Sequence, residues 1–237
     1  MNQIYEERLG TDRMLPLVFR MALPAIVAQM VNLLYNIVDR IYIGKIPGEG
    51  TLALASIGLC FPFVTLITAF ANLFGLGGAP LCAMARGKGN REGAQGIMVN
   101  AGFMLLLSGA VLTVLGIAFH RPLLYLFGAS EVTYPYASSY IVIYLLGTLC
   151  VMLSLGLNPY INCQGFARTG MLTVALGAAA NIVLDPIFIF ALHLGVRGAA
   201  IATVLSQFLS AAWVVKFLTG KKAELKLDFR GFRPDWQ

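Results

Sequence analysis

Two aspartates, Asp39 and Asp185, lie deep inside long apolar stretches of the sequence and are the residues best suited to chemistry. An aspartate at the centre of a membrane helix costs about 2.5 to 3.5 kcal/mol on insertion scales. We therefore expect each to face a partner or a water-filled site rather than lipid. Carboxylate oxygens are hard ligands, and at membrane depth they bind Na⁺ or relay protons. The sequence thus predicts a cation site.

Polar residues at helical spacing accompany both aspartates. Gln29, Asn32, Asn36 and Asp39 are separated by 3, 4 and 3 residues, which places them on one face of a helix. Asn181 precedes Asp185 by one helical turn. Consecutive membrane helices alternate in direction. Both aspartates and Thr203 are therefore expected in the outer half of the membrane. The predicted cation-binding set is Asp39, Asn181, Asp185 and Thr203. The alternative is that Asp39 pairs with Arg40 near the interface and Asp185 bonds neighbouring helices.

Further polar and aromatic residues are predicted to line a cavity for a solute. Two tyrosines four residues apart offer an aromatic wall to a cationic, amphipathic molecule. The alternatives are core packing for the tyrosines and hydrogen bonding between helices for the other polar residues. The cavity set is Gln29, Asn32, Tyr35, Asn36, Thr68, Asn72, Tyr140, Tyr144 and Gln207. Three prolines, Pro24, Pro62 and Pro186, are predicted to leave helix carbonyls without their usual donors, as occurs at transport sites and hinges.

Membrane helices are the elements that must position these side chains. Of the 237 residues, 58% are hydrophobic and 12% are charged, about half the charged fraction of a soluble domain. Six apolar runs are long enough to cross a bilayer and lack the strict alternation of barrel strands. They cover residues 15–43, 52–76, 97–119, 136–157, 171–192 and 198–218. The predicted fold is an all-α membrane protein, a bundle of six transmembrane helices.

Basic residues give the bundle a direction. Of the 17 Lys and Arg, all but Arg40, Lys45, Arg121 and Arg197 fall on the side of both termini. The positive-inside rule then places both termini in the cytoplasm of a plasma or inner membrane. We predict an N-terminal cytoplasmic segment at 1–14, a membrane lobe at 15–219 and a solvated cytoplasmic tail at 220–237.

Several classes of protein are excluded by the same residues. The net charge of +6 is spread between apolar segments, which argues against nucleic-acid binding. The cysteines show no CxxC spacing and are predicted to be free, and neither histidine has a partner at zinc-ligand spacing. No nucleophile has a base at helical spacing, so an enzyme is not expected, and no cofactor is predicted beyond a coupling ion. GLGGAP, at 75–80, is predicted to be a helix end or break.

The sequence resembles the multidrug and toxic compound extrusion (MATE) family, within the wider class of multidrug, oligosaccharidyl-lipid and polysaccharide exporters. The matching stretches are LPAIVAQMVNLLYNIVDRIYIG, ARGKGNREGAQ, NPYINCQGFARTGMLTVALGAAANIVLDPIFIF and GVRGAAIATVLSQ, in that order. The resemblance implies twelve helices in two lobes and cation-coupled export of organic cations and other amphipaths. It also implies that Asp39, Asn181, Asp185 and Thr203 match the first lobe's cation site, and that Pro24 matches a proposed hinge of the first helix.

The chain is half the size that the resemblance implies and resembles the first lobe, with its tail similar to the inter-lobe linker. A parallel homodimer or a separate second lobe would complete a transporter, since an even number of spans gives both lobes the same orientation. The alternatives are a truncated membrane module without transport activity and a flippase for lipid-linked oligosaccharides. The leading hypothesis is Na⁺- or H⁺-coupled export of xenobiotics. Burial and repulsion between the aspartates should make them titrate as a pair.

Overall fold

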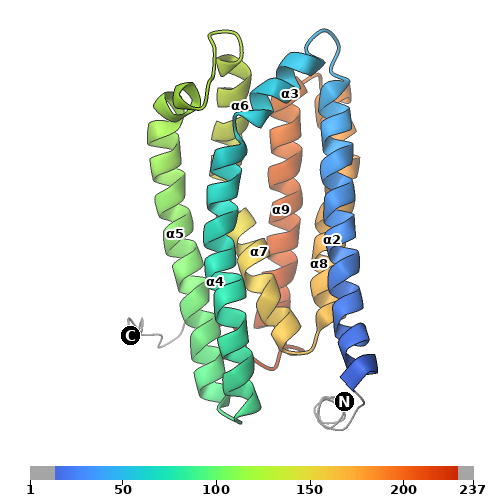
Figure 1. Cartoon of the computed structure of the whole chain (residues 1–237), viewed down its shortest axis with the longest axis vertical. Helices are drawn as coiled ribbons and strands as arrows, with labels where there is room; N and C mark the ends of the chain where they lie inside the picture. The colour runs from blue at the N-terminus through green and yellow to red at the C-terminus, as the bar shows by residue number, and fades with distance from the viewer. Residues whose placement is uncertain (1–13, 229–237) are drawn as a thin grey trace.

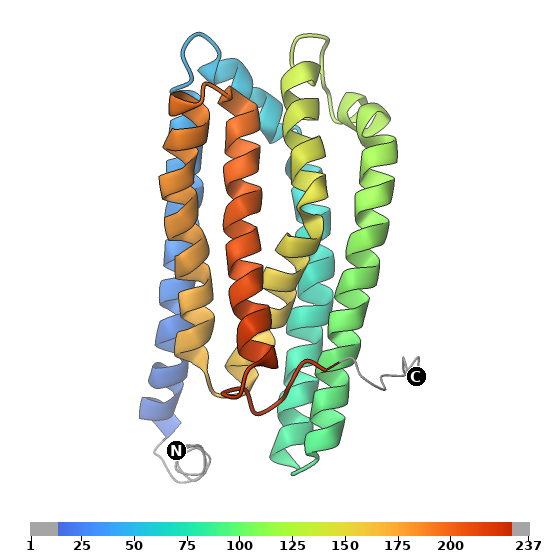
Figure 2. The same cartoon turned by 180° about the vertical axis from the view of Figure 1, so that it is seen from behind.

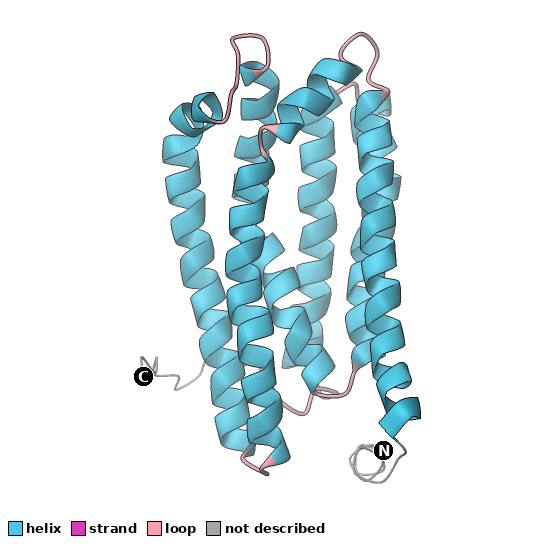
Figure 3. Cartoon of the chain, in the orientation of Figure 1, coloured by secondary structure: helices cyan, strands magenta, loops and turns pink. Residues whose placement is uncertain are grey.

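The computed structural model describes residues 14–228, with side chains described from Ala22 onward, and this part of the chain consists of helices joined by short loops (Figure 3). The long apolar runs form helices because a bilayer leaves each backbone group to be satisfied within its own segment. The helices are α2 (Met14–Gly44), α3 (Gly50–Gly58), α4 (Phe61–Gly87), α5 (Arg91–Leu126), α6 (Tyr134–Leu146), α7 (Thr148–Cys163), α8 (Ala167–Pro186), the π-helix η1 (Ile187–Ala191) and α9 (Gly195–Thr219).

The helices stand side by side in an up-and-down bundle (Figures 1 and 2). Five of them are long and apolar enough to cross a membrane, and α6 with α7 makes a sixth span if the bent pair is counted as one. The prediction of six spans is therefore confirmed. Both ends of the described chain lie at the lower end of the bundle in Figure 1, which we call the terminal end. Residues 1–13 and 229–237 of the predicted terminal segments lie outside the described part of the chain.

The helix pairing places the two predicted aspartates side by side. Helix α2 packs mainly against α8, while α4 packs against α5 and α7. Helix α9 contacts both α7 and α8, and joins the two groups at the back of the view in Figure 1. The helices that carry Asp39 and Asp185 are thus direct neighbours.

The second span begins later than the hydropathy of the sequence predicts. The apolar run from 52 to 76 is divided by a turn at Leu59 and Cys60, so its first part forms α3 across the upper end of the bundle. Pro62 lies in the first turn of α4, where a proline removes no helical hydrogen bond. The prediction that Pro62 leaves a helix carbonyl without its donor is therefore wrong.

Residues 75–80 lie within α4, so the predicted helix end or break there is also wrong. A Cβ atom on Gly75 would lie 2.7 Å from the carbonyl oxygen of Gly156 in α7. One turn later, Gly78 leaves room for the Tyr160 ring, whose hydroxyl donates to the Phe74 carbonyl oxygen at 2.7 Å. These glycines allow α4 and α7 to approach closely, as small residues do in membrane helix pairs.

The fourth span is bent by 56° between α6 and α7. A Cβ atom on Gly147, at the bend, would lie 2.6 Å from the Val204 side chain of α9. The hydroxyl of Thr148 is buried without a hydrogen-bond partner. The fifth span also departs from a regular helix, because α8 continues beyond Pro186 as η1.

The outer surface of the bundle is apolar. Leu66, Leu73 and Val114 are among the exposed large hydrophobic side chains, with half or more of their area accessible. Exposed apolar area of this extent on a folded chain is expected where lipid is the solvent. The core between the helices includes Leu105, Met152, Leu157 and Tyr160, which are fully buried.

Residues 221–228 form a strap across the terminal end of the bundle, running from α9 toward α4 and α5 (Figure 2). Alternate residues Ala223, Leu225 and Leu227 are buried. The Glu224 carboxylate accepts a hydrogen bond from Arg86 Nε at 2.9 Å and forms an ion pair with that guanidinium, while Gln164 Oε1 accepts from the backbone amides of Glu224 and Leu225. The prediction of a solvated tail is therefore wrong for this segment.

Candidate functional site

The carboxyl groups of Asp39 and Asp185 are in direct side-chain contact, although the two residues are 146 positions apart in the sequence. Helix α2 presents Asp39 late in its course, and α8 presents Asp185 just before Pro186. Asp185 is fully buried, and its Oδ1 accepts a hydrogen bond from Asn181 Nδ2 at 3.1 Å. Two carboxylates in contact repel each other, so the arrangement requires a shared proton or a cation.

Three buried oxygens at this point have no hydrogen-bond partner: Asp39 Oδ1, Asp185 Oδ2 and Asn181 Oδ1. Buried polar atoms are almost always satisfied, so unpaired acceptors on three residues linked by direct contacts call for a positively charged or donating ligand. Carboxylate and carboxamide oxygens are ligands for hard cations. A proton needs only one carboxylate oxygen, whereas Na⁺ would need several of these oxygens. The residues present therefore fit either coupling ion.

Two tyrosines lie near the carboxyl pair. Tyr35 of α2 and Tyr140 of α6 are near enough to Asp39 to interact with it electrostatically. The rings of Tyr140 and Tyr144 are stacked, with centroids 6.2 Å apart, and each tyrosine is only 6% exposed. In this conformation both tyrosines are core residues of the lobe. This agrees with core packing, the alternative to an aromatic wall that faces a solute.

Arg40 acts on Asp39 electrostatically, but its side chain packs on an aromatic ring. Its guanidinium lies 5.8 Å from the centroid of the Phe61 ring, a cation–π contact at the start of α4. Arg40 is exposed, whereas the neighbouring Asp39 is partly buried and faces α8. The geometry thus favours the pairing of two aspartates over a simple Asp39–Arg40 ion pair at the interface.

Thr203 is half-buried on α9, and its backbone carbonyl accepts a hydrogen bond from Ser206 Oγ at 2.7 Å. Among the described side chains, no hydrogen bond joins its hydroxyl to Asp39, Asn181 or Asp185. The structure therefore brings together three of the four residues predicted for the cation site. Thr203 remains a predicted cation ligand, and the helices would have to pack differently for its hydroxyl to reach the other three residues.

The residues predicted to line a cavity fall into two groups. Gln29, Asn36 and Asn72 are exposed on α2 and α4, while Asn32, Tyr35 and Thr68 are half-buried. Asn36 Nδ2 donates to the backbone carbonyl of Asn32 at 2.7 Å, and Thr68 Oγ1 donates to that of Val64 at 2.8 Å, so both also bond their own helices.

Gln207 forms a bond between helices. Its Oε1 accepts a hydrogen bond of 2.6 Å from Ser154 Oγ, which links α9 to α7. Sequence reasoning did not identify Ser154, because serine is common in membrane helices and a single small hydroxyl gives no periodic signal. The hinge candidate Pro24 lies inside α2 and is half-buried.

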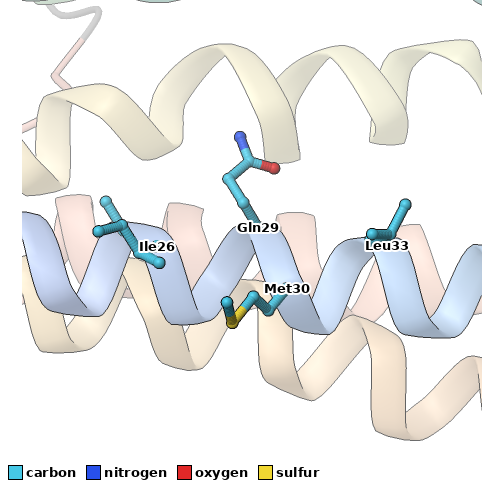
Figure 4. A pocket seen from close by; sticks show the side chains of 5 residues that line it. Ile26, Gln29, Met30 and Leu33 are labelled. Atoms are coloured by element: carbon cyan, nitrogen blue, oxygen red, sulfur yellow. The ribbon is translucent and has the colours of Figure 1, made fainter.

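A shallow apolar depression lies on α2 beside the predicted cavity residues. It is lined by Ala25, Ile26, Gln29, Met30 and Leu33, all from this one helix (Figure 4). The Gln29 side chain projects from the opposite side of α2 to that of Met30 (Figure 4). A depression built from one helix cannot enclose a solute, because binding pockets for small molecules bury most of the ligand surface. A solute site would need a second wall.

Fold and site together define the class of protein: a multi-pass membrane bundle with a paired carboxyl site at membrane depth, typical of secondary transporters. The MatE family profile matches residues 24–187, and the chain belongs to this family.

Curated relatives agree with this assignment. The multidrug export protein MepA of Staphylococcus haemolyticus is 26% identical over 213 residues, which are 90% of this chain and 47% of the relative. An FAD transporter of Shewanella oneidensis is 31% identical over 224 residues, 91% of this chain and 49% of the relative. The chain thus spans about half the length of the curated relatives it matches, and these relatives are named as transporters.

Solved structures give the same result. A crystal structure of MATE in the bent conformation superposes with a TM-score of 0.85 at 31% identity, covering 92% of this chain and 48% of that one. A Pyrococcus furiosus transporter of the MOP superfamily gives a TM-score of 0.85 at 30% identity, with the same coverage. The predicted resemblance to one lobe of such a transporter is therefore confirmed.

Proposed function

We propose that this chain is one lobe of a cation-coupled antiporter that exports amphipathic or cationic small molecules across the cell membrane, with both termini in the cytoplasm. The observation that carries the proposal is the contact between Asp39 and Asp185, with three unpaired buried oxygens around it. The family membership and the names of the relatives support export as the activity.

Charge neutralisation drives the proposed cycle. A proton or Na⁺ that enters from outside binds between the carboxyl groups and removes their repulsion, and Asn181 orients Asp185 through its hydrogen bond. Neutralisation favours a conformation with α2 packed differently against α8, and bending at Pro24 supplies that change. By linkage, solute binding must weaken cation binding as much as the cation weakens solute binding.

A second lobe completes the solute pathway. The depression on α2 has only one wall, and the matched relatives and structures are about twice as long as this chain. An even number of spans places two copies of the chain, or this chain and a separate second lobe, in the membrane with the same orientation. A parallel pair would bring two exposed faces of α2 and α4 together around the solute.

Reconstitution in proteoliposomes tests the proposal. The chain is first brought to a defined oligomeric state, checked by native mass measurement, and efflux of a fluorescent lipophilic cation is then followed with and without a Na⁺ or pH gradient. Asp39→Asn with Asp185→Asn should abolish the gradient-dependent part. Glu92→Gln is the matched control, because Glu92 is an exposed carboxylate at the start of α5. Full coupled efflux by the double variant would refute the assignment. Absence of coupled efflux from the reconstituted dimer would exclude the homodimer and leave the pair with a separate second lobe.

A dinucleotide is the second candidate solute. The relative from Shewanella oneidensis that is named an FAD transporter is 31% identical to this chain, more than the MepA relative. The same vesicles loaded with FAD distinguish the two solute classes. Coupled loss of FAD, with retention of the lipophilic cation, would favour the dinucleotide.

A further inference from the structure

Two cysteines at the terminal end of the bundle form a close pair that the proposed transport cycle does not use. Cys82 of α4 and Cys163 of α7 have Sγ atoms 3.7 Å apart. We propose that this pair is a site of reversible oxidation, in which a peroxide converts two thiols into a disulfide that joins α4 to α7.

The helices hold the two sulfur atoms in place. Helices α4 and α7 are in tight contact at Gly75 and Gly156, and the Tyr160 hydroxyl bonds the Phe74 carbonyl one turn before Cys163. A disulfide bond is about 2.05 Å long, so the sulfurs must approach by about 1.7 Å. Rotation of the two side chains about their Cα–Cβ bonds is the movement that brings the sulfurs together.

The two thiols differ in access to water. Cys82 is fully buried and its sulfur lies 3.4 Å from the Ala94 carbonyl oxygen, whereas Cys163 is half-buried at the last residue of α7. Arg86 Nη1 donates to the Cys163 carbonyl oxygen at 3.1 Å, and its guanidinium interacts electrostatically with both sulfurs. Partial exposure is a feature of oxidation-sensitive cysteines. A dissolved oxidant therefore reaches the pair from the side of Cys163, whose thiol donates to the Cys82 sulfur.

The chemistry takes two steps. One sulfur of the pair attacks one oxygen of hydrogen peroxide, the O–O bond breaks, and a sulfenic acid and one water are formed. The other sulfur then attacks the sulfenic sulfur, the S–O bond breaks, and the hydroxyl leaves with the proton of the second thiol as a second water. Two thiols and one peroxide become one disulfide and two waters, and an external dithiol reverses the reaction by exchange.

The disulfide would lie beside the anchor of the strap. Cys163 precedes Gln164, whose side chain holds the backbone amides of Glu224 and Leu225, and Arg86 pairs with Glu224. Oxidation would fix the end of α7 to α4 beside the residues that hold the strap. The remaining cysteines, Cys60 and Cys150, are free and provide an internal control.

Two variants in detergent micelles test the proposal. Cys60→Ser with Cys150→Ser leaves only the pair, and Cys82→Ser with Cys163→Ser leaves only the controls. Each is treated with hydrogen peroxide, denatured, counted for free thiols with a chromogenic disulfide reagent, and digested with trypsin, which cuts after Arg86, Lys88 and Arg91 and so separates the two cysteines of the pair.

The variant with the pair should lose both free thiols, with a tryptic linkage between the α4 and α7 segments within one molecule that dithiothreitol cleaves. The control variant should keep both of its thiols under the same treatment. The proposal is overturned if Cys163 is oxidised to sulfinic acid while Cys82 stays free, if linkages form only between molecules, or if the control variant loses thiols at the same rate.

Discussion

Two glycines of α4 allow the effect of close contact with α7 on stability to be separated from the effect of helix propensity. Gly75 and Gly77 lie two residues apart in the same helix, and alanine at either position gains about 1 kcal/mol of helix propensity. A Cβ atom on Gly77 would meet nothing within 4 Å. A Cβ atom on Gly75 would lie 2.7 Å from the carbonyl oxygen and 3.0 Å from the Cα atom of Gly156.

The expected penalty follows from these distances. Backbone atoms cannot rotate away, so Gly75→Ala must push α4 and α7 apart by several tenths of an ångström, and overpacking of this kind costs about 1 to 3 kcal/mol. Because both variants gain the same propensity, Gly75→Ala should be less stable than Gly77→Ala by about that amount. Unfolding with sodium dodecyl sulfate in mixed micelles, followed by circular dichroism, measures the difference. Equal stability of the two variants would refute the close helix contact.

Three further substitutions probe contacts elsewhere in the lobe. Glu224→Gln weakens the ion pair with Arg86, so trypsin should cleave within the strap faster than in the unmodified chain, and unchanged cleavage would show that this ion pair does not hold the strap. Ser154→Ala removes the 2.6 Å bond to α9 and should lower stability by about 1 kcal/mol in the same micelle assay, whereas no loss would mean that the bond is dispensable. Gly147→Ala should destabilise the bend between α6 and α7, and Val204→Ala should restore part of the loss if the clash with that side chain is the cause.

The sequence predicted which polar side chains the structure brings together better than it predicted the boundaries of the helices. Insertion cost singles out Asp39 and Asp185, because an aspartate without a partner is expelled from lipid, and helical spacing adds Asn181. That argument needs no knowledge of the loops. The contact between the two aspartates follows from the packing of α2 against α8, which a single sequence does not specify.

Hydropathy does not locate a helix boundary when the residues of the turn are apolar. The residues between α3 and α4 are Leu59 and Cys60, so the apolar run continues through a break in the helix. The glycines at 75–80 were interpreted as a break because glycine is a poor helix former in water, yet in a membrane it serves close packing. The docked strap did carry a signal, since Ala223, Leu225 and Leu227 alternate with polar residues, and that period of two predicts an extended segment with one buried side.

The central claim is that Asp39 and Asp185 form one cation site, and a double-mutant cycle of cation binding tests it most directly. Binding of Na⁺ and uptake of protons by the chain in micelles are measured for the unmodified chain, Asp39→Asn, Asp185→Asn and the double variant. If the carboxyl groups share one ion, each single substitution should remove most of the binding and the double variant should lose little more. Independent losses that add up in the double variant would contradict the shared site.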